Sequence, residues 1–232
     1  MRKLIGFVTL ALIAVALLTG QDSRGGRGIA LEESYLQESI DSMLIREQSR
    51  SESREVKESA LATIEAALQR GARNEEIRIA LETMSLEGIV NRTMKDGVIV
   101  NNFPDIRSRT ARCLGIMGGT QAYTILIRML GAETQAFVLT EVVNALMAVG
   151  LNPNNETVKL ITKRVRHFDV TLPDNLLAFA ALRAYERFAS ENGWRLDTDT
   201  EALLVSISNG RYHPMACASA RDLLDKLRSY HG

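Results

Sequence analysis

The chain has 232 residues, of which 46% are apolar, 24% are charged and only 5% are aromatic. This composition excludes disorder over the whole chain, and the shortage of aromatic residues beside abundant Leu, Ala and Ile favours helices over a β-sandwich. The 28 basic and 28 acidic residues balance, which removes the electrostatic reason to expect nucleic acid as a partner.

Residues 1–20 have the pattern of a secretory signal peptide. A weakly polar to apolar run of 15 residues follows the basic pair Arg2-Lys3. The run is shorter than the roughly 20 residues that a membrane-spanning helix needs, but it suits a signal sequence. We therefore expect cleavage after Gly20, with the AVA step at 14–16 as the alternative site. An uncleaved membrane anchor is the alternative to cleavage.

The residues around the expected cleavage site bear on localisation. Leu18-Thr19-Gly20 resembles the start of a bacterial lipoprotein box, but Gln21 stands where that box has its lipid-bearing cysteine. Without the thiol no lipid can be attached at this position. We expect a periplasmic or secreted protein, with membrane association only if the first segment stays uncleaved.

A flexible leader and one amphipathic helix are expected over 21–53. The leader is QDSRGGRG, and the helix runs from Ile29 to about Gln48. This helix caps the exposed end of the helical array that follows or, alternatively, reaches for a partner. The charged stretch REQSRSESREVKES after it is a linker or a continuous solvated helix. The apolar residues expected on one face of the helix are Leu36, Ile40, Met43 and Leu44.

From residue 54 onward, helix follows helix, each with start and stop signals. An insertion at about 96–104, DGVIVNNFP, interrupts the series. Its residues 98–100 form either a short extended segment or a loop tucked against the core. The expected helices cover 56–70, 75–89, 105–117, 120–130, 134–149, a segment through 158–165, 173–191, 200–208 and 214–229.

The helices recur at a regular distance in the sequence. Superimposing Ala111 and Leu114 on Val143 and Leu146 gives an offset of 32 residues, and the next unit follows at an offset of 36. Helix pairs that recur at this distance indicate a solenoid, in which each pair buries its apolar face against its neighbours. A four- or five-helix globular bundle is the alternative.

The stretch ARCLGIMGGT predicts a tight helical hairpin. Ala111, Leu114, Gly115 and Gly118 fall at i, i+3, i+4 and i+7, so one face of the helix is mostly small and a neighbouring helix can approach it closely. That approach offsets the roughly 1 kcal/mol that glycine costs in a helix. Two glycines then end the helix, and we expect Thr120 to cap the next one.

The segment PDIRSRTARCLGIMGGTQAYTILIRML resembles a HEAT-like repeat of the type found in phycobilisome-lyase-related proteins. The best match covers 104–150, and the likeness is suggestive over 54–230. The resemblance implies an α-solenoid, but it implies little about activity, because the family spans adaptors, a few enzymes and DNA-repair scaffolds. The matching residues are Arg107, Ala111, Leu114, Gly115 and Gly118, followed in the next unit by Ala145, Leu146 and Gly150.

The sequence lacks the familiar patterns of catalytic and metal sites. It has no His-Glu step of the kind repeated in the di-iron hydroxylase among HEAT-like proteins, and it has no H-x-x-x-H, C-x-x-C, G-x-G-x-x-G or G-x-S-x-G motif. His213 lies at a helix start and His231 on the C-terminal tail, so neither is placed like a ligand. We expect no catalytic residue, metal or cofactor.

Both cysteines stand where a small apolar residue would suit a helix. Cys113 lies in ARCLG and Cys217 in MACASA, each on the apolar side of its predicted helix. Cysteine in such a position acts as a small hydrophobe. We expect two reduced core residues and no disulfide.

The polar cluster that best suits binding is KLITKRVRHF, residues 159–168. Lys159, Lys163 and Arg166 fall at i, i+4 and i+7 and form a basic stripe, with Arg164 and His167 beside it. In HEAT-type arrays the second helix of each pair lines the concave surface, and this helix is a second one. The pattern favours a solvated helix face with aliphatic residues beneath it; the alternative is a groove for an acidic peptide or an anionic headgroup.

A second cluster, Tyr185, Phe188 and Trp194, follows near the end of the long helix. We expect these aromatic residues to pack in the core, with an aromatic binding site as the alternative.

These expectations combine into an exported, non-catalytic scaffold or adaptor in a cell-envelope complex. The concave face of the array would bind a protein partner. A lyase-like or accessory protein that holds a small ligand is one alternative. A membrane-anchored peripheral protein that binds anionic lipid is the other.

Overall fold

A computed structural model describes residues 39–171 and 173–231 of the chain. The expected signal peptide, the leader and the first part of the expected 29–48 helix lie outside these residues. The chain divides into two compact units, Met1–Ile40 and Asp41–Gly232. The description below concerns the second unit.

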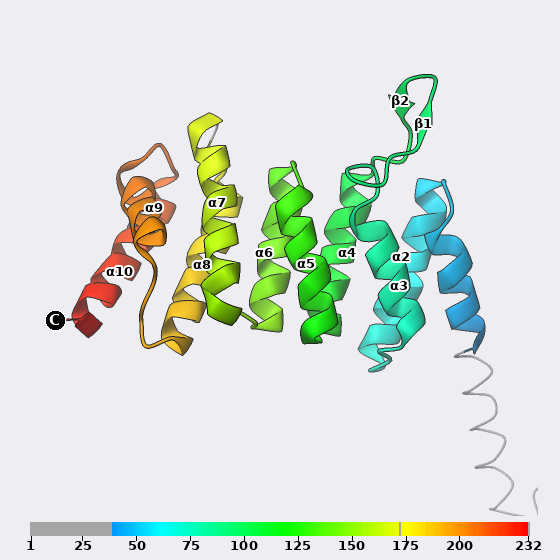
Figure 1. Ribbon diagram of the computed structural model, residues 1–232, viewed down its shortest axis with the longest axis horizontal. Helices are drawn as coiled ribbons and strands as arrows, with labels where there is room; N and C mark the ends of the chain where they lie inside the picture. The colour runs from blue at the N-terminus through cyan, green and yellow to red at the C-terminus, as the bar shows by residue number, and fades with distance from the viewer. Residues whose placement is uncertain (1–38, 172, 232) are drawn as a thin grey trace, which may run out of the picture. The chain divides into compact units, whose positions relative to one another are not determined.

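The fold is all-α apart from one small hairpin (Figure 1). The hairpin consists of β1 (Met94–Lys95) and β2 (Val98–Ile99), and a short 3-10 turn covers Pro153–Asn155. A helix over 39–49 precedes the series. The other described helices are α2 (Arg54–Gln69), α3 (Glu75–Ser85), α4 (Pro104–Met117), α5 (Gly119–Ala132), α6 (Ala136–Val149), α7 (Glu156–Thr171), α8 (Asn175–Glu191), α9 (Thr198–Asn209) and α10 (Pro214–His231).

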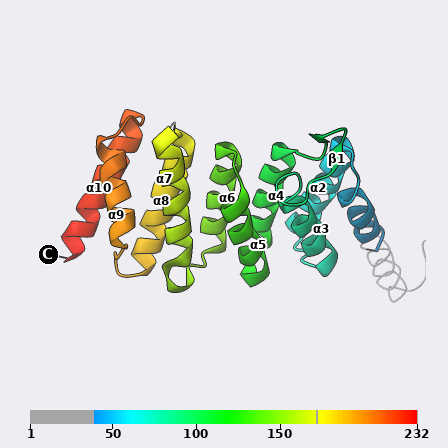
Figure 2. The ribbon, with the colours of Figure 1, turned by 45° about the horizontal axis from the view of Figure 1, so that its top comes forward.

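The helices pack in two rows of successive neighbours. In one row α2 contacts α4, α4 contacts α6, α6 contacts α8 and α8 contacts α10. In the other row α3, α5, α7 and α9 contact one another in the same order. Figures 1 and 2 show the helices of this unit side by side in chain order. Each helix from α3 to α10 therefore packs on a neighbour in its own row and on an adjacent helix of the other row, whereas α2 packs mainly on α4.

The core is one continuous cluster of apolar side chains that reaches from Ile45 to Leu227. Tyr185 and Phe188 belong to it, as the expectation of core packing requires. Trp194 is partly buried and stacks on Tyr230, with ring centroids 5.0 Å apart and planes within 10°. Cys113 and Cys217 are both buried free thiols, on α4 and α10 respectively.

Side-chain oxygen atoms cap the starts of α2, α3, α8 and α9. A carboxylate, amide or hydroxyl oxygen at the N-cap accepts a backbone N–H that has no partner within the first turn. Because this bond needs an extended backbone at the cap, it marks where the helix begins. The capping residues are Ser53 for α2, Asn74 for α3, Asp174 for α8 and Asp197 for α9.

The hairpin between α4 and α5 has the close helix approach that its small residues predict. A Cβ added at Gly115 would lie 3.0 Å from the Cα of Ala145 on α6. The expectation that Thr120 caps α5 is wrong, because α5 already begins at Gly119 and makes no side-chain cap. Gly118 and Gly119 turn the chain with φ angles of 68° and 79°, and this leaves Thr120 inside the first turn.

The helix over 39–49 buries a different face from the expected one. Met43 and Leu44 are exposed, whereas Ile45 is 1% exposed and belongs to the core. The periodicity places these residues on a helix correctly, but the face that packs is turned toward Ile45.

The interruption expected at about 96–104 is longer than the sequence pattern suggests. Helix α3 ends at Ser85, short of the expected residue 89, and no helix resumes before Pro104. Within this connection β1 and β2 pair antiparallel, with Met94 opposite Ile99 and Lys95 opposite Val98. Val98 is 64% exposed. Val98 and Ile99 therefore form the short extended segment that we gave as one alternative. Val98 is not tucked against the core, which was the other alternative.

Candidate functional site

Three of the five expected binding residues line one groove between α7 and α9. Lys159, Lys163 and Arg166 project from successive turns of α7, because their spacing places them on one face. The N-terminal end of α9 forms the opposite side. The groove has a volume of about 440 Å³. Its lining residues are Lys159, Thr162, Lys163, Arg166, Asp197, Thr198 and Asp199.

The two lysines of the groove are free to bind, whereas its arginine is already engaged. Lys159 and Lys163 are exposed, and neither pairs with another residue in the described part of the chain. Arg166 donates from Nη2 to the backbone oxygen of Asp199 at 2.6 Å and lies 3.4 Å from the carboxylate of that residue. The ion pair crosses the groove from α7 to α9, so Arg166 sets the distance between its two walls.

A buried polar cluster forms the floor of the groove. The hydroxyl of Thr162 on α7 donates to the hydroxyl oxygen of Tyr185 on α8 at 3.1 Å and lies 2.9 Å from that of Thr200 on α9. Asp197 accepts from the Thr200 hydroxyl and backbone N–H, each at 3.0 Å. Burial raises the pKa of Tyr185 above its ordinary value. The floor is therefore a set of satisfied hydrogen bonds that ties three helices together.

The groove carries both signs of charge. Two free ammonium groups and one paired guanidinium face the carboxylates of Asp197 and Asp199, which already accept hydrogen bonds. The lining has three cationic side chains and two carboxylates, so its net charge is +1, and the ammonium groups of Lys159 and Lys163 make no ion pair in the described part of the chain. Such a surface can hold a carboxylate, phosphate or sulfate group that a partner presents.

Arg164 and His167, the other two expected residues, lie away from the groove lining. The Arg164 guanidinium donates to the backbone oxygen of Glu133, at the end of α5. Burial lowers the pKa of Arg164. His167 is exposed and meets the ring of Phe168 edge-on, with ring centroids 5.6 Å apart. The groove thus brings together three of the five expected residues and leaves out Arg164, which packs against the end of α5, and His167.

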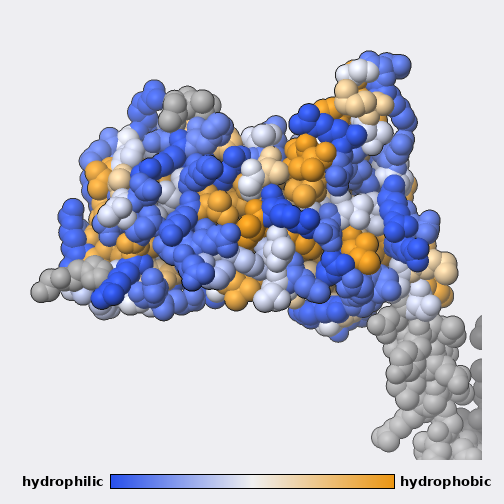
Figure 3. Space-filling model, in the orientation of Figure 1, coloured by the Kyte–Doolittle hydropathy of each residue, from blue (hydrophilic) through white to orange (hydrophobic). Residues whose placement is uncertain are grey.

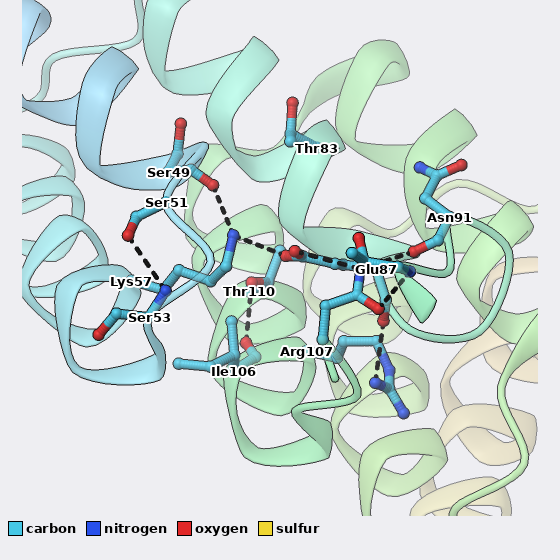
Figure 4. Close-up of polar contacts among 12 residues, drawn as sticks. Ser49, Ser51, Ser53, Lys57, Thr83, Glu87, Asn91, Ile106, Arg107 and Thr110 are labelled. Carbon is cyan, nitrogen blue, oxygen red and sulfur yellow. Dashed lines mark hydrogen bonds and ion pairs between the residues drawn. The ribbon is translucent and has the colours of Figure 1, made fainter. Parts of the chain in front are cut away.

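A second polar cluster lies beneath the connection between α3 and α4 (Figure 4). The ammonium group of Lys57 is 1% exposed, lies 2.8 Å from the carboxylate of Glu87, and donates to the backbone oxygen of Ser49 at 2.8 Å. Because an unpaired buried charge is costly, these contacts hold 86–103 against α2 and the 39–49 helix.

Arg107 extends this cluster toward α6. Its side chain is 1% exposed and makes a two-pronged ion pair with Glu133, which is 0% exposed, at 2.7 and 3.2 Å. The same guanidinium donates to the backbone oxygen of Glu87 and to the side-chain oxygen of Asn102. Glu133 also accepts the backbone N–H groups of Thr134 and Gln135. Arg107 therefore joins the 86–103 connection to the connection between α5 and α6.

The sequence indicates one part of this second cluster but not the other. Arg107 stands out through the repeat resemblance, but its partner Glu133 carries no signal in the sequence. Lys57 lies in the charged stretch that reads as a linker or a solvated helix. Its burial follows from the loop that folds over it, and that loop is not periodic.

The remaining candidate ligands are dispersed. His213 accepts the backbone N–H of Met215 at Nδ1 and so serves as a cap at the start of α10. Within 39–171 and 173–231, no group of three or more His, Cys, Asp or Glu residues could hold a metal ion. None of the helices in the described part is both long and apolar enough to cross a membrane.

Compared with models of known protein families and with curated protein sequences, the chain matches none of them.

Proposed function

We propose that this protein is an exported, non-catalytic scaffold or adaptor that binds an acidic segment of a protein partner. The proposed binding surface is the groove between α7 and α9. The observation that carries the proposal is the pair of free, exposed ammonium groups of Lys159 and Lys163, one helical turn apart on one wall. An extended acidic segment could pair with both groups.

We further propose that the helices form an α-solenoid of HEAT-like hairpins. Three features support this: the packing of each helix on its successive neighbours, the sequence offsets of 32 and 36 residues, and the match of the 104–150 segment to the repeat pattern. In such an array the row α3, α5, α7 and α9 offers one extended surface, on which a partner docks by side-chain complementarity. This row faces the viewer in Figure 3, where polar patches alternate with apolar ones.

The cellular location that we propose for the complex is inferred only from the sequence of residues 1–20. Their basic head and short apolar run are typical of a signal peptide. A periplasmic or secreted protein with a binding surface and no identified reaction suits a role in a cell-envelope complex. Intact-mass measurement of the protein from its native host tests cleavage after Gly20, because a mass that includes Met1 contradicts it.

The charge of the groove gives the direct test of the proposed function. Affinity capture with chemical crosslinking in the native host identifies the partner, and binding of the purified partner is then measured. The double variant Lys159→Glu with Lys163→Glu should weaken this binding at least about tenfold, because both charges would repel an acidic segment. Its melting temperature should stay within about 3 °C of the wild type, since neither lysine is paired.

A matched control separates the groove from net charge. Arg183→Glu reverses an exposed cation on α8, in the other row of helices, and should leave the affinity within about twofold. If the two lysine substitutions leave the affinity unchanged, the groove is not the binding surface. Capture of a small chromophore or metal ion in place of a protein would contradict the scaffold itself.

A further inference from the structure

The hairpin of β1 and β2 is the least explained part of the described structure. It projects beyond the ends of the helices in Figure 1, and its side chains form a separate knob in Figure 3. Met94 is 55% exposed and Val98 is 64% exposed. Burial of these two side chains against a partner would be favourable, so the projecting hairpin is a candidate interaction site.

Both faces of the hairpin carry an exposed apolar side chain. Residues that pair across two strands point to the same face. Met94 shares a face with Ile99, and Lys95 shares the opposite face with Val98. A flat partner could cover only one of these faces. A cleft that receives the tip would cover both.

The tip is held in one conformation by its turn. Asp96 and Gly97, the two residues of the turn, both have positive φ angles, 51° and 78°. This is the type I′ turn that matches the twist of paired strands, and Asp-Gly is one of its preferred sequences. A hairpin built on this turn loses little conformational freedom when it binds.

The base of the hairpin is anchored to the helices. The buried side chain of Asn101 accepts the backbone N–H of Thr93 at 2.8 Å and donates to the backbone oxygen of Asn91 at 2.9 Å. Lys95 pairs with Glu52 at 2.7 Å, before the start of α2, and this hydrogen bond lowers the pKa of Glu52. Glu87 is in turn held by Lys57, so the hairpin is fixed at its base and, through Lys95, beside its turn.

The charges near the tip identify the kind of surface that it fits. Asp96 at the apex is exposed and pairs with no other residue in the described part of the chain, whereas the nearby Lys95 is already neutralised by Glu52. A lipid bilayer would have to take up the apical carboxylate, which is costly in an apolar medium and unfavourable beside anionic headgroups. A protein cleft with a basic group at its end would pair with that carboxylate.

We propose that this hairpin is a preformed docking finger that inserts into an apolar cleft of a protein partner, with Met94 and Val98 against the two walls and Asp96 toward a basic group. The finger is separate from the groove between α7 and α9, so either site can fail without the other.

The test begins by locating what the tip touches in cells of the native host. A photoreactive benzoylphenylalanine is placed at position 98 or 94 of the full chain, and at position 176 as a control. Leu176 on α8 is 65% exposed, so it matches Val98 in exposure. One protein should be crosslinked from positions 98 and 94 and not from position 176.

Binding of that protein, once purified, is then measured against variants of the tip. Met94→Thr with Val98→Thr keeps residues that suit a strand and should weaken binding about 10- to 100-fold, whereas Leu176→Thr should have no effect. Asp96→Asn keeps a turn sequence of the same type and should weaken binding several-fold, because it removes only the apical charge.

Four results would overturn the proposal. One is affinity that the tip variants leave unchanged, and another is crosslinking from positions 98 and 94 that does not exceed that from position 176. The third is binding to vesicles of phosphatidylcholine with 30% phosphatidylglycerol that depends on Met94 and Val98. The fourth is self-association in sedimentation that the double variant abolishes, since the occupant would then be a second copy of the chain.

Discussion

The ion pair of Arg107 and Glu133 is the most deeply buried ion pair among the described residues. Both side chains are removed from water, so neither charge can be left alone at low cost. We expect Arg107→Met to lower the free energy of unfolding by about 3–5 kcal/mol. The cause is the uncompensated Glu133 carboxylate and the loss of the bonds to Glu87 and Asn102. Urea unfolding followed by circular dichroism measures the change.

The same helix offers a matched control for this prediction. Arg112 on α4 pairs with Glu141 on α6 at 3.5 Å, but its side chain is 57% exposed. Arg112→Met should change the free energy of unfolding by less than about 1 kcal/mol, because exposed ion pairs contribute little. Equal losses in the two variants would mean that burial of Arg107 does not decide its contribution.

Gly115 on α4 has no side chain and therefore allows α4 to approach α6 closely. Because a Cβ at Gly115 would meet Ala145 at 3.0 Å from its Cα and 3.1 Å from its Cβ, a larger residue must push the helices apart. We expect Gly115→Val to lower the free energy of unfolding by about 1–3 kcal/mol through overpacking. Thermal and urea unfolding of the purified variant provide the measurement.

Gly131 serves as a control, because it is a helical glycine that has no close neighbour. Gly131 lies in α5, and an added Cβ there would meet nothing within 4 Å. Gly131→Ala should therefore raise the free energy of unfolding by up to about 1 kcal/mol through helix propensity alone. If Gly115→Val were as stable as the wild type, the close approach of α4 and α6 would not be needed for packing.

Whether a helix or strand can be predicted from the sequence depends on how far apart in the chain the residues that stabilise it lie. Helices such as α4 and α8 follow from apolar periodicity and from start signals that lie within one turn, so the sequence places them within a few residues. The bounds of the 86–103 connection and the burial of Lys57 depend on contacts between α2, the loop and α4. Those contacts are distant in sequence and leave no periodic pattern.

Only the part of the candidate groove that depends on spacing within one helix could be predicted from the sequence. The i, i+4, i+7 spacing places Lys159, Lys163 and Arg166 on one face whatever surrounds the helix. Arg164 lies about 100° around the helix from Lys163, and it donates to the backbone oxygen of Glu133 at the end of α5. The acidic wall at Asp197 and Asp199 comes from α9 and gives no sign in the α7 sequence.

If the whole unit is the proposed solenoid, it should unfold in parts and not all at once. In an array each hairpin depends on its nearest neighbours, so parts of it open without the rest. The α9–α10 hairpin lies at one end of the described helices and contacts the others mainly through α7 and α8. In hydrogen exchange followed by mass spectrometry, α9 and α10 should open together at lower free energy than α4 and α6, which have neighbours on both sides.

Two core substitutions sharpen this prediction. Leu204 in α9 and Leu146 in α6 are both 0% exposed, and replacing either by Ala removes a similar amount of buried surface, at about 2–5 kcal/mol. Leu204→Ala should speed exchange in α9 and α10 and leave α4 and α6 at the wild-type rate, whereas Leu146→Ala should speed exchange in the central helices. If Leu204→Ala accelerates exchange equally in every helix, the helices share one cooperative core. A globular bundle would then describe the molecule better than an array.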